Sequence, residues 1–418
     1  MDAAIQQSSD TSANRQRNKG MRPLRRLNSF AILLLSSILL TFGNKIYELV
    51  LPLLMYELTH SSVAMAQMRT AELLPNFFFA VFIGVIVDRV NKKTWVISMV
   101  GAQAVLLIAL VLLVRSGSPY FFLYYLIGFL LMTFNYGYFN AQMSLTKLAV
   151  PGQQLTQANA KFSLVDTFFG VMGPALSGLI LMLAHLYDGL LMTAAAYLIC
   201  VLLLFQLRLN QGQDARVTHG TMWEDLREGW KAFRANRLMG TMTLFIMGLN
   251  CTMTVVGTTL IFYAKDDLHL SDSLLALVLS VSGVGGLAAS LFVGRLRTKF
   301  GIGVLFGCSA LVNGLSYLGM FASSNVYMLL PALLANGFAM TVYAVCANTF
   351  RHEQTPVHLI GRISGITGML YRVGMPVAMM ISGYMIQDLG ASSVFIASAA
   401  FNLVLFALLL RTALWRTR

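Results

Sequence analysis

Long apolar runs, separated by short polar stretches, dominate the hydropathy pattern of this 418-residue chain. A helix needs about 20 mostly apolar residues to cross the hydrocarbon layer of a membrane. Backbone groups in lipid must bond within their own segment, and the runs are too long and too uniform for the short alternating strands of a barrel. The pattern therefore predicts twelve membrane-spanning helices, at 30–56, 63–86, 94–114, 120–142, 162–184, 189–207, 239–263, 273–294, 302–322, 326–349, 363–386 and 391–410.

The longest polar interruption divides these spans into six and six. Within it, residues 222–235 have the amphipathic spacing of a helix on a membrane surface, although a plain tether is equally compatible. Pro151 precedes Gly178 by 27 residues, and Pro356 precedes Gly383 by the same 27. Such recurrence at half-chain distance is typical of duplicated bundles. We therefore expect an all-α membrane protein of two pseudo-symmetric six-helix bundles, with a disordered tail at 1–28, bundles at 29–207 and 239–411, a linker at 208–238 and a tail at 412–418.

Composition and charge support a membrane protein and argue against a nucleic-acid partner. Hydrophobic residues make up 57% of the chain and charged residues only 11%, whereas soluble domains carry about 25% charged residues. The formal net charge is +13. If the N-terminus is cytoplasmic, 25 of the 30 Lys and Arg residues lie on that side, as membrane topology requires. We expect a multi-pass protein of a bacterial cytoplasmic membrane with both termini cytoplasmic.

The chemistry of enzymes and metal sites is missing from the sequence. The four cysteines fall inside predicted spans without metal-ligand spacing, and the histidines lie in loops. No Gly-Lys-Ser/Thr loop is present to hold a nucleotide, and no nucleophile–base pair is apparent. We therefore predict no catalytic residue, metal or cofactor.

Four ionisable residues fall deep inside the first two spans. Lys45 with Glu48, and Arg69 with Glu72, are each spaced i, i+3 on one helix face. At about 1.5 Å per residue, all four lie roughly 20–30 Å from the cytoplasmic ends, where their charges cancel in one cluster. The cluster is either a fixed salt-bridge network or a proton carrier. Burial favours the neutral form of a carboxylic acid and a nearby cation favours the charged form, so a broken pair would take up a proton. Glu72 is the first candidate because Pro75 opens the helix nearby.

Two further charges occupy nearly matching places in the halves. Asp166 lies early in span five, and Arg372 lies early in span eleven. Either one would latch the cytoplasmic side when the central chamber faces outward. Pairing of Asp166 within its own bundle is the alternative.

The loop after span two resembles the signature of the major facilitator superfamily. It reads Gly84-Val-Ile-Val-Asp88-Arg89-Val-Asn91-Lys92-Lys93, with Asn91 in place of the second glycine. In that family this loop governs switching between inward- and outward-facing states. The resemblance therefore implies a conformational switch that involves Gly84, Asp88, Arg89, Lys92 and Lys93, together with Arg362 in the matching loop of the second half.

Span five resembles the antiporter signature that separates exporters from importers in the same family. The matching residues are Gly170, Gly173, Pro174 and Gly178, with Ser177 where the usual pattern has a glycine. Ordinary packing of helices through small residues is the alternative. The stretches 150–160 and 361–365 are similar to the drug:proton antiporter branch that contains macrolide effluxers and bacterial siderophore (enterobactin-type) exporters. Many drug antiporters carry an Arg in span four, but residues 120–146 contain no basic residue, so their proton scheme does not transfer intact.

In the family, spans one, four, seven and ten line the transport pathway. The candidate substrate-binding residues of this chain are Asn135, Tyr136, Tyr138, Asn250, Thr254, Asn336, Tyr343 and Asn348. A pocket with aromatics and few charges suits a bulky, largely apolar or amphipathic small molecule. The resemblance implies a proton-coupled, alternating-access exporter, a monomer whose partners are its substrate, protons and membrane lipid. A lipid or lysolipid flippase of the same fold and a transport-inactive membrane sensor remain alternatives.

Overall fold

The computed structural model describes residues 28–79, 83, 86–87, 90–150, 154–181, 185–207, 222–355 and 359–417, and its elements in these ranges are helices. The first half contains α2 (Ser29–Thr59), α3 (Ser62–Phe79), α5 (Lys92–Arg115), α6 (Phe121–Ala149), α7 (Leu155–Leu181) and α8 (Leu186–Phe205). Helix α9 (Met222–Ala235) covers the amphipathic stretch. The second half contains α10 (Arg237–Phe262), α11 (Asp272–Phe300), α12 (Ile302–Ala322), α13 (Val326–Gln354), α14 (Ile360–Leu370), α15 (Met375–Leu389) and α16 (Ala391–Leu410).

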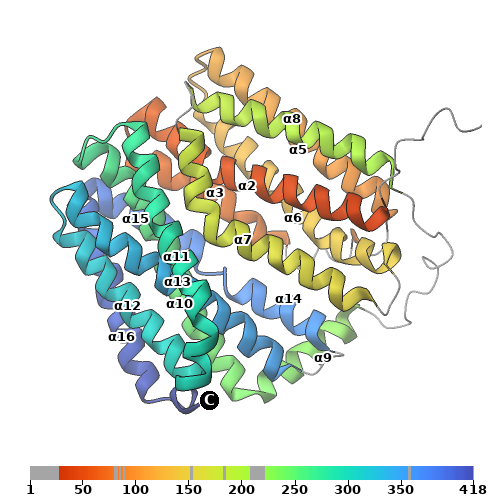
Figure 1. Cartoon of the computed structure of the whole chain (residues 1–418). Helices are drawn as coiled ribbons and strands as arrows, with labels where there is room; N and C mark the ends of the chain where they lie inside the picture. The colour runs from red at the N-terminus through yellow and green to blue at the C-terminus, as the bar shows by residue number, and fades with distance from the viewer. Residues whose placement is uncertain are drawn as a thin grey trace, which may run out of the picture.

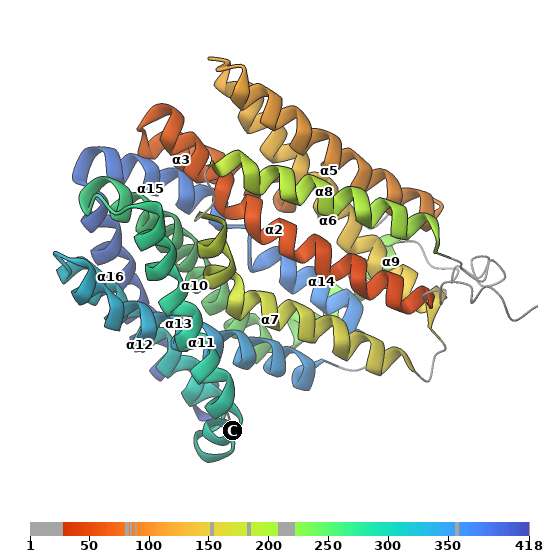
Figure 2. The same cartoon turned by 45° about the horizontal axis from the view of Figure 1, so that its top comes forward.

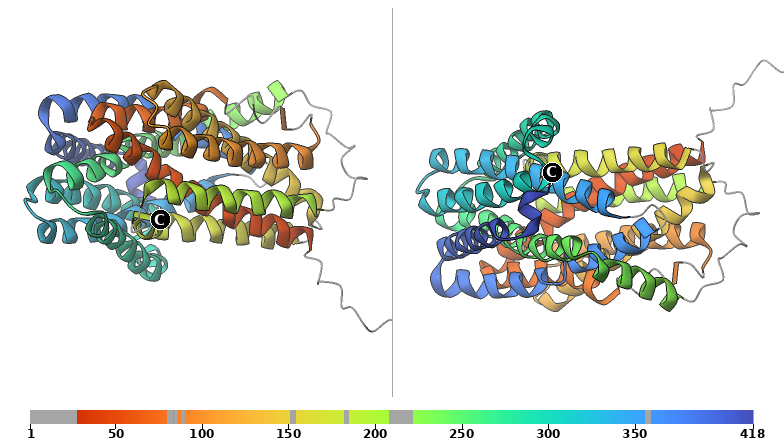
Figure 3. Two further views of the ribbon diagram at one scale, coloured as in Figure 1. Left: turned by 90° about the horizontal axis from the view of Figure 1, so that it is seen from above. Right: turned by 90° about the horizontal axis from the view of Figure 1, so that it is seen from below.

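These helices form two bundles, as the sequence predicts. Helices α2, α3, α5, α6, α7 and α8 pack among themselves, and so do α10 to α16. Figure 1 shows the first bundle, red to yellow-green, above the second, green to blue. In Figure 2, α3 of the first bundle lies beside α15 of the second. In the two views of Figure 3, the bundles meet at one end of the molecule, and the first bundle extends from there toward the opposite end. We call the meeting end, where α2 ends, the Thr59 end, and the opposite end the Ser29 end.

Ten helical segments in the described part of the chain are long and apolar enough to cross a membrane. Helices α14 and α15 together make one of them. Helices α3 and α7 fall outside this set, and α3 carries Gln67, Arg69 and Glu72 within its 18 residues. With these two helices the ten match the twelve predicted spans.

A backbone feature repeats in the two halves. His60 follows α2, and His269 follows the π-helix η3 (Tyr263–Asp267) that ends α10; both have a φ of 50°. A positive φ is uncommon for residues other than glycine. The two positions are 209 residues apart (269 minus 60), which agrees with the half-chain offset of the sequence motifs.

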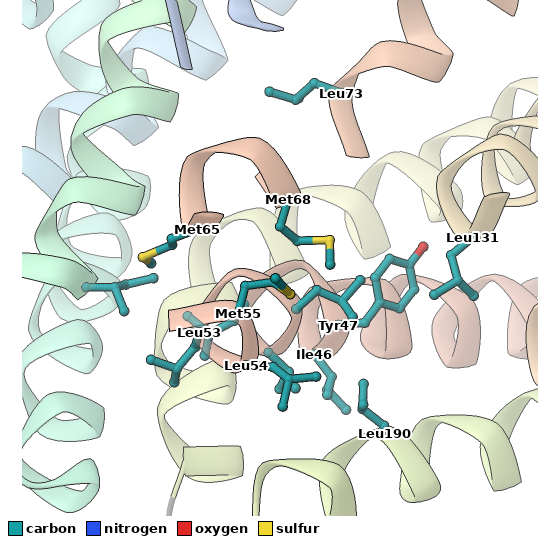
Figure 4. Packing of buried hydrophobic residues seen from close by; sticks show 14 of the residues in the cluster. Ile46, Tyr47, Leu53, Leu54, Met55, Met65, Met68, Leu73, Leu131 and Leu190 are labelled. Carbon is teal, nitrogen blue, oxygen red and sulfur yellow. The ribbon is translucent and has the colours of Figure 1, made fainter. Parts of the chain in front are cut away.

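Helix α2 is the centre of the first bundle. Tyr47 and Leu53 are fully buried, and they lie among Met68 of α3, Leu131 of α6 and Leu190 of α8 (Figure 4). In the second bundle, α11 and α13 approach closely through glycines. A Cβ atom at Gly337 would lie 1.8 Å from the Ser282 carbonyl oxygen. Small residues allow this close approach of helices in membranes.

The predicted eleventh span, 363–386, is not one continuous helix. Helix α14 ends at Leu370, a turn covers residues 371–374, and α15 begins at Met375. Pro376 explains the break, because proline has no backbone N–H and its ring clashes with the carbonyl four residues earlier, here that of Arg372. The two shorter helices therefore replace the single predicted one.

The C-terminal segment 412–418, expected as a simple tail, packs against the second bundle. A short 3-10 helix covers Ala413–Arg416, and Leu414 is fully buried. The Gly303 backbone N–H donates to the Thr417 carbonyl at 3.0 Å. The segment thus closes the Ser29 end of α12.

Candidate functional site: a chain of charges in the first bundle

The four predicted charges of α2 and α3 lie together in one chain. Lys45 Nζ lies 2.8 Å from Glu48 Oε2, and Arg69 Nη1 lies 2.9 Å from Glu72 Oε2. Arg69 Nη2 also bonds Glu48 Oε1, which joins the two helices. The order is Lys45, Glu48, Arg69, Glu72, so cations and anions alternate. The sequence predicted this cluster from the i, i+3 spacing and the antiparallel course of the two helices.

Burial increases along this chain of charges. The side chain of Lys45 is 33% exposed, that of Glu48 25%, that of Arg69 12% and that of Glu72 0%. One oxygen of Glu72, Oε1, is buried and has no hydrogen-bond partner. The chain of charges therefore runs from an accessible amine to an enclosed carboxylate whose second oxygen is free.

Helices α6 and α7 enclose this cluster through glycines. A Cβ atom at Gly173 of α7 would lie 3.3 Å from Lys45 Cδ, so the antiporter-type segment packs on the stem of the exposed cation. A Cβ atom at Gly128 of α6 would lie 2.8 Å from Met68 Sδ and 3.9 Å from Glu72 Cγ. Gly173 thus leaves room for the stem of Lys45, and Gly128 leaves room for Met68 beside Glu72.

Such an arrangement is able to hold a proton without a large change of structure. Two cations and two anions cancel, which makes the buried group tolerable in a membrane. A proton on Glu72 Oε1 would leave one positive charge in excess, and Arg69 retains Glu48 as its second partner. The chemistry that fits is proton uptake and release.

Asp166 and Arg372 do not pair with each other. Asp166 is exposed on α7 and feels the positive charge of Lys45. Arg372 is exposed in the turn between α14 and α15, where its Nη1 donates to Asn76 Oδ1 of α3 at 3.2 Å. The contact of Arg372 with the opposite bundle is thus to an amide rather than an acid.

The predicted switch loop is only partly visible. Gly84, Asp88 and Arg89 lie outside the described residues. Lys93 Nζ donates to the carbonyls of Phe205 at 2.9 Å and Leu207 at 2.7 Å, so it caps the end of α8 within its own bundle. Cations near helix C-termini bond the last free carbonyls in this way.

Asn91, which replaces the expected second glycine of the loop, has a local structural role. Its Oδ1 accepts from the Thr94 backbone N–H at 3.1 Å and caps α5. Asparagine is among the preferred residues at this position. Lys92 is half-buried one residue later. Asn91, which stands where the family pattern has a glycine, therefore caps the start of the next helix.

The remaining family-motif residues are described in part. Gly170 is exposed, and nothing lies within 4 Å of a Cβ atom placed there. Arg362 belongs to α14, and Pro174 and Gly178 to α7, but their side chains are outside the described part. Their proposed roles stay predictions.

Two predicted substrate-binding residues form a network in the second bundle. Tyr343 of α13 donates to Asn250 Oδ1 of α10 at 2.7 Å, and Asn250 Nδ2 donates to the Tyr371 carbonyl at 3.0 Å. That carbonyl lies at the break between α14 and α15. Asn250 therefore satisfies a backbone group near the interrupted helix.

Other candidates bond to neighbouring helices or turns. Asn336 Nδ2 donates to Asn313 Oδ1 of α12 at 2.9 Å, and Asn348 Oδ1 accepts from Arg351 at 2.9 Å. The first bond joins two helices of the second bundle, and the second lies within α13.

The candidates of α6 and the last one of α10 differ in exposure. Tyr138 is fully enclosed, so it lines no open space in this conformation. Asn135 is buried, and its Oδ1 has no hydrogen-bond partner. Tyr136 and Thr254 are half-buried.

Contacts between the bundles join them near the Thr59 end. Tyr56 donates to Asp266 Oδ1 at 2.8 Å, and its ring lies 5.3 Å from that of Phe262. Ser62 donates to the Gly383 carbonyl at 3.2 Å. The bundles also contact each other along α7 and α11.

Sequence reasoning missed Asn76, Asp266 and Tyr371. Asn76 follows Glu72 by one helical turn, so the i, i+4 spacing is the signal that would have found it. The other two are joined to their partners by contacts between distant segments, which no local pattern reveals.

An apolar groove of about 310 Å³ between α11, α12 and α13 is separate from the chain of charges.

Comparison with known proteins agrees with the helical arrangement. The family model of the Major Facilitator Superfamily matches residues 33–263 and 249–418. Macrolide efflux protein A of Streptococcus pyogenes is 20% identical over 355 residues, covering 82% of this chain and 85% of that protein. The Enterococcus faecalis protein of the same name is 20% identical over 319 residues, covering 73% and 96%.

Two solved structures share the fold at low sequence identity. The nucleoside transporter NupG has a TM-score of 0.74 at 14% identity, covering 94% of this chain and 100% of that one. A bacterial homologue of the iron transporter ferroportin, in an inward-facing state, has a TM-score of 0.69 at 16% identity, with the same coverage.

Proposed function

Because the chain belongs to the Major Facilitator Superfamily, we propose that it is a secondary exporter that moves a bulky amphipathic small molecule by proton antiport. The observation that carries this proposal is the chain of charges ending at the enclosed Glu72, whose Oε1 has no partner. Ionisable groups at membrane depth mark proton relays and substrate pathways. The likeness to macrolide efflux proteins supports export as the direction.

The proposed orientation has the Ser29 end in the bacterial cytoplasm, with both termini inside. The positive-inside distribution of Lys and Arg supports it. In this orientation the contacts of Tyr56 and Ser62 with the second bundle close the outer side. The structure is then a cytoplasm-facing member of an alternating-access cycle, in which two matched bundles rock about a central chamber.

Coupling then follows from a change of partners. Rocking of the bundles alters the packing of α7 on α2, where Gly173 contacts the stem of Lys45. Displacement of Lys45 from Glu48 draws Arg69 toward Glu48 and away from Glu72. Glu72 without its cation takes up a proton, because burial favours the neutral acid. Return of Arg69 releases it.

Glu72→Gln tests this proposal. The purified chain, reconstituted in liposomes with its Ser29 side outward, is given a pH jump and a fluorescent amphipathic dye, with a labelled lysolipid in a parallel sample. We expect Glu72→Gln to abolish dye uptake driven by the pH gradient while downhill exchange of the dye persists. Glu57→Gln removes an exposed acid from the end of α2 and is the matched control.

Gradient-driven uptake at the wild-type rate in Glu72→Gln would remove Glu72 from coupling. Transport of the lysolipid without the dye would favour the flippase alternative. Movement of neither compound, in protein that binds both, would favour a transport-inactive sensor.

A further inference from the structure

Arg372 lies at the surface between the two bundles and has no acidic partner among the described residues. It lies in the break between α14 and α15, it is exposed, and its guanidinium donates to the neutral amide oxygen of Asn76 at 3.2 Å. A charged side chain at membrane depth faces a bundle interior or a water-filled cavity rather than lipid. Its position against α3 of the opposite bundle agrees with that expectation.

The second bundle contains no acid that could neutralise Arg372 at its own depth. Between Arg237 and Arg418 the sequence has five acids, Asp266, Asp267, Asp272, Glu353 and Asp388. Each lies at or beside an end of its helix. Asp388 is on the same broken span but 16 residues further along, which is about 24 Å at the rise of a helix. Glu353 is already paired with Arg297.

None of the described acids of the first bundle at this depth pairs with Arg372. Glu48 and Glu72 are bonded to Lys45 and Arg69, and this cluster of two cations and two anions is neutral. Glu72, one turn before Asn76, is fully enclosed and paired with Arg69. Asp166 is exposed on α7, close enough to interact with the charge of Lys45, and does not pair with Arg372. Among the described residues, the hydrogen-bond partner of Arg372 is thus the neutral amide of Asn76 and not an acid.

The backbone next to Arg372 is held in place by side chains of the second bundle. The preceding Tyr371 carbonyl is fixed by Asn250, and Asn250 is in turn held by Tyr343. Helix α15 begins at Met375, three residues after Arg372, so the positive end of its dipole lies near the Arg372 backbone. Guanidinium groups bind carboxylate and phosphate oxygens in pairs of charge-assisted hydrogen bonds.

We propose that Arg372 binds an anionic group of the transported molecule, so that the substrate class is an anionic amphipath with a carboxylate or phosphate. This inference rests on the proposed export function and adds the charge of the cargo. In it, the anion displaces the Asn76 amide from Arg372 and occupies the space between the bundles. The aromatic and methionine side chains around the pathway then hold the apolar part.

The test uses binding rather than transport. The probes are 11-(dansylamino)undecanoic acid and its primary amide, which share fluorophore and chain length and differ only in the terminal charge. Dansyl fluorescence is titrated with the full-length chain in detergent, with no pH gradient. We expect wild-type protein to bind the carboxylate at least about tenfold more tightly than the amide, as for a hydrogen bond to a charged group.

The variants separate the charge from the fold. Arg372→Gln should bring the ratio of the two affinities, carboxylate over amide, to about one. Arg372→Lys should retain part of the preference for the carboxylate, because it keeps the charge but loses the paired donors. Asn76→Ala should keep or increase the ratio, because it removes only the competing amide. Arg295→Gln, which loses an exposed cation at the Ser29 end of α11, should leave the ratio unchanged.

Equal or absent binding of the two probes by the wild type would overturn the proposal, as would an undiminished ratio in Arg372→Gln. A reduced ratio in Arg295→Gln equal to that in Arg372→Gln would also overturn it, because the effect would be one of net charge. These results are independent of Glu72. Charge-selective binding without gradient-driven uptake would contradict the antiport proposal alone.

Discussion

Replacement of Arg69 should destabilise the protein far more than replacement of Lys45, although both cations belong to one cluster. Arg69 is 12% exposed and bonds two carboxylates, one of them the fully enclosed Glu72. Lys45 is 33% exposed and bonds Glu48, which keeps Arg69 as a partner when Lys45 is removed. The two substitutions therefore leave very different groups behind.

The magnitude follows from the stranded carboxylate. Arg69→Gln leaves Glu72 enclosed without its cation, and an isolated charge at membrane depth costs about 2.5–3.5 kcal/mol. Lys45→Gln breaks one partly exposed pair, which contributes under about 1 kcal/mol. We expect a loss of about 3 kcal/mol in the first variant. In the double variant Arg69→Gln with Glu72→Gln the charges balance, so most of the loss should be recovered.

Reversible unfolding of the detergent-solubilised protein in increasing SDS, followed by tryptophan fluorescence, measures these free energies. The penalty of Arg69→Gln should shrink at acidic pH, because a proton on the stranded carboxylate removes its charge. Losses for Arg69→Gln and Lys45→Gln that agree within about 0.5 kcal/mol would refute the reasoning, and so would additive effects in the double variant.

Three further substitutions test other parts of the structure. Gly337→Ala should abolish the folded protein, since its Cβ would lie 1.8 Å from the Ser282 carbonyl oxygen, whereas Gly257→Ala, with open space, should keep the wild-type yield in gel filtration. Lys93→Ala removes two hydrogen bonds at the end of α8 and should lower the SDS unfolding free energy by about 1 kcal/mol; an unchanged value would mean that water replaces the cap. Tyr56→Phe removes the hydrogen bond to Asp266 and should make a cysteine introduced near Leu53 react several-fold faster with a thiol-reactive probe added from the Thr59 side. An unchanged labelling rate would mean that packing alone holds that end closed.

The sequence predicted most of the fold because membrane helices are long and uniformly apolar. The pairing of Lys45, Glu48, Arg69 and Glu72 was also predictable, since helix geometry fixes the i, i+3 face and a short loop fixes the antiparallel partner. The break at residues 371–374 was missed, although Pro376 was visible, because many membrane helices tolerate proline without ending. The mean hydropathy of the whole span stays high across such a short turn, so it does not reveal the break.

The predicted substrate-binding residues show where local patterns fail. Asn336 and Asn250 are both polar residues in apolar helices, yet the first bonds to Asn313 inside its bundle and the second fixes the carbonyl of the interrupted span. The difference depends on which way each helix is turned toward its neighbours. Contacts between residues 23 and 121 positions apart decide that rotation, and the periodicity of a single helix does not reveal them.

The interrupted span has a mechanical consequence. Its α14 piece contacts the connector helix α9, through Phe233 and Ile363, whereas its α15 piece contacts α3 of the other bundle. The turn from Tyr371 to Gly374 is a hinge about which the two pieces are able to tilt separately. A movement of the connector helix α9 would then move α14 while α15 stays packed against α3. The length and attachment of the connector would therefore limit how far the two bundles separate.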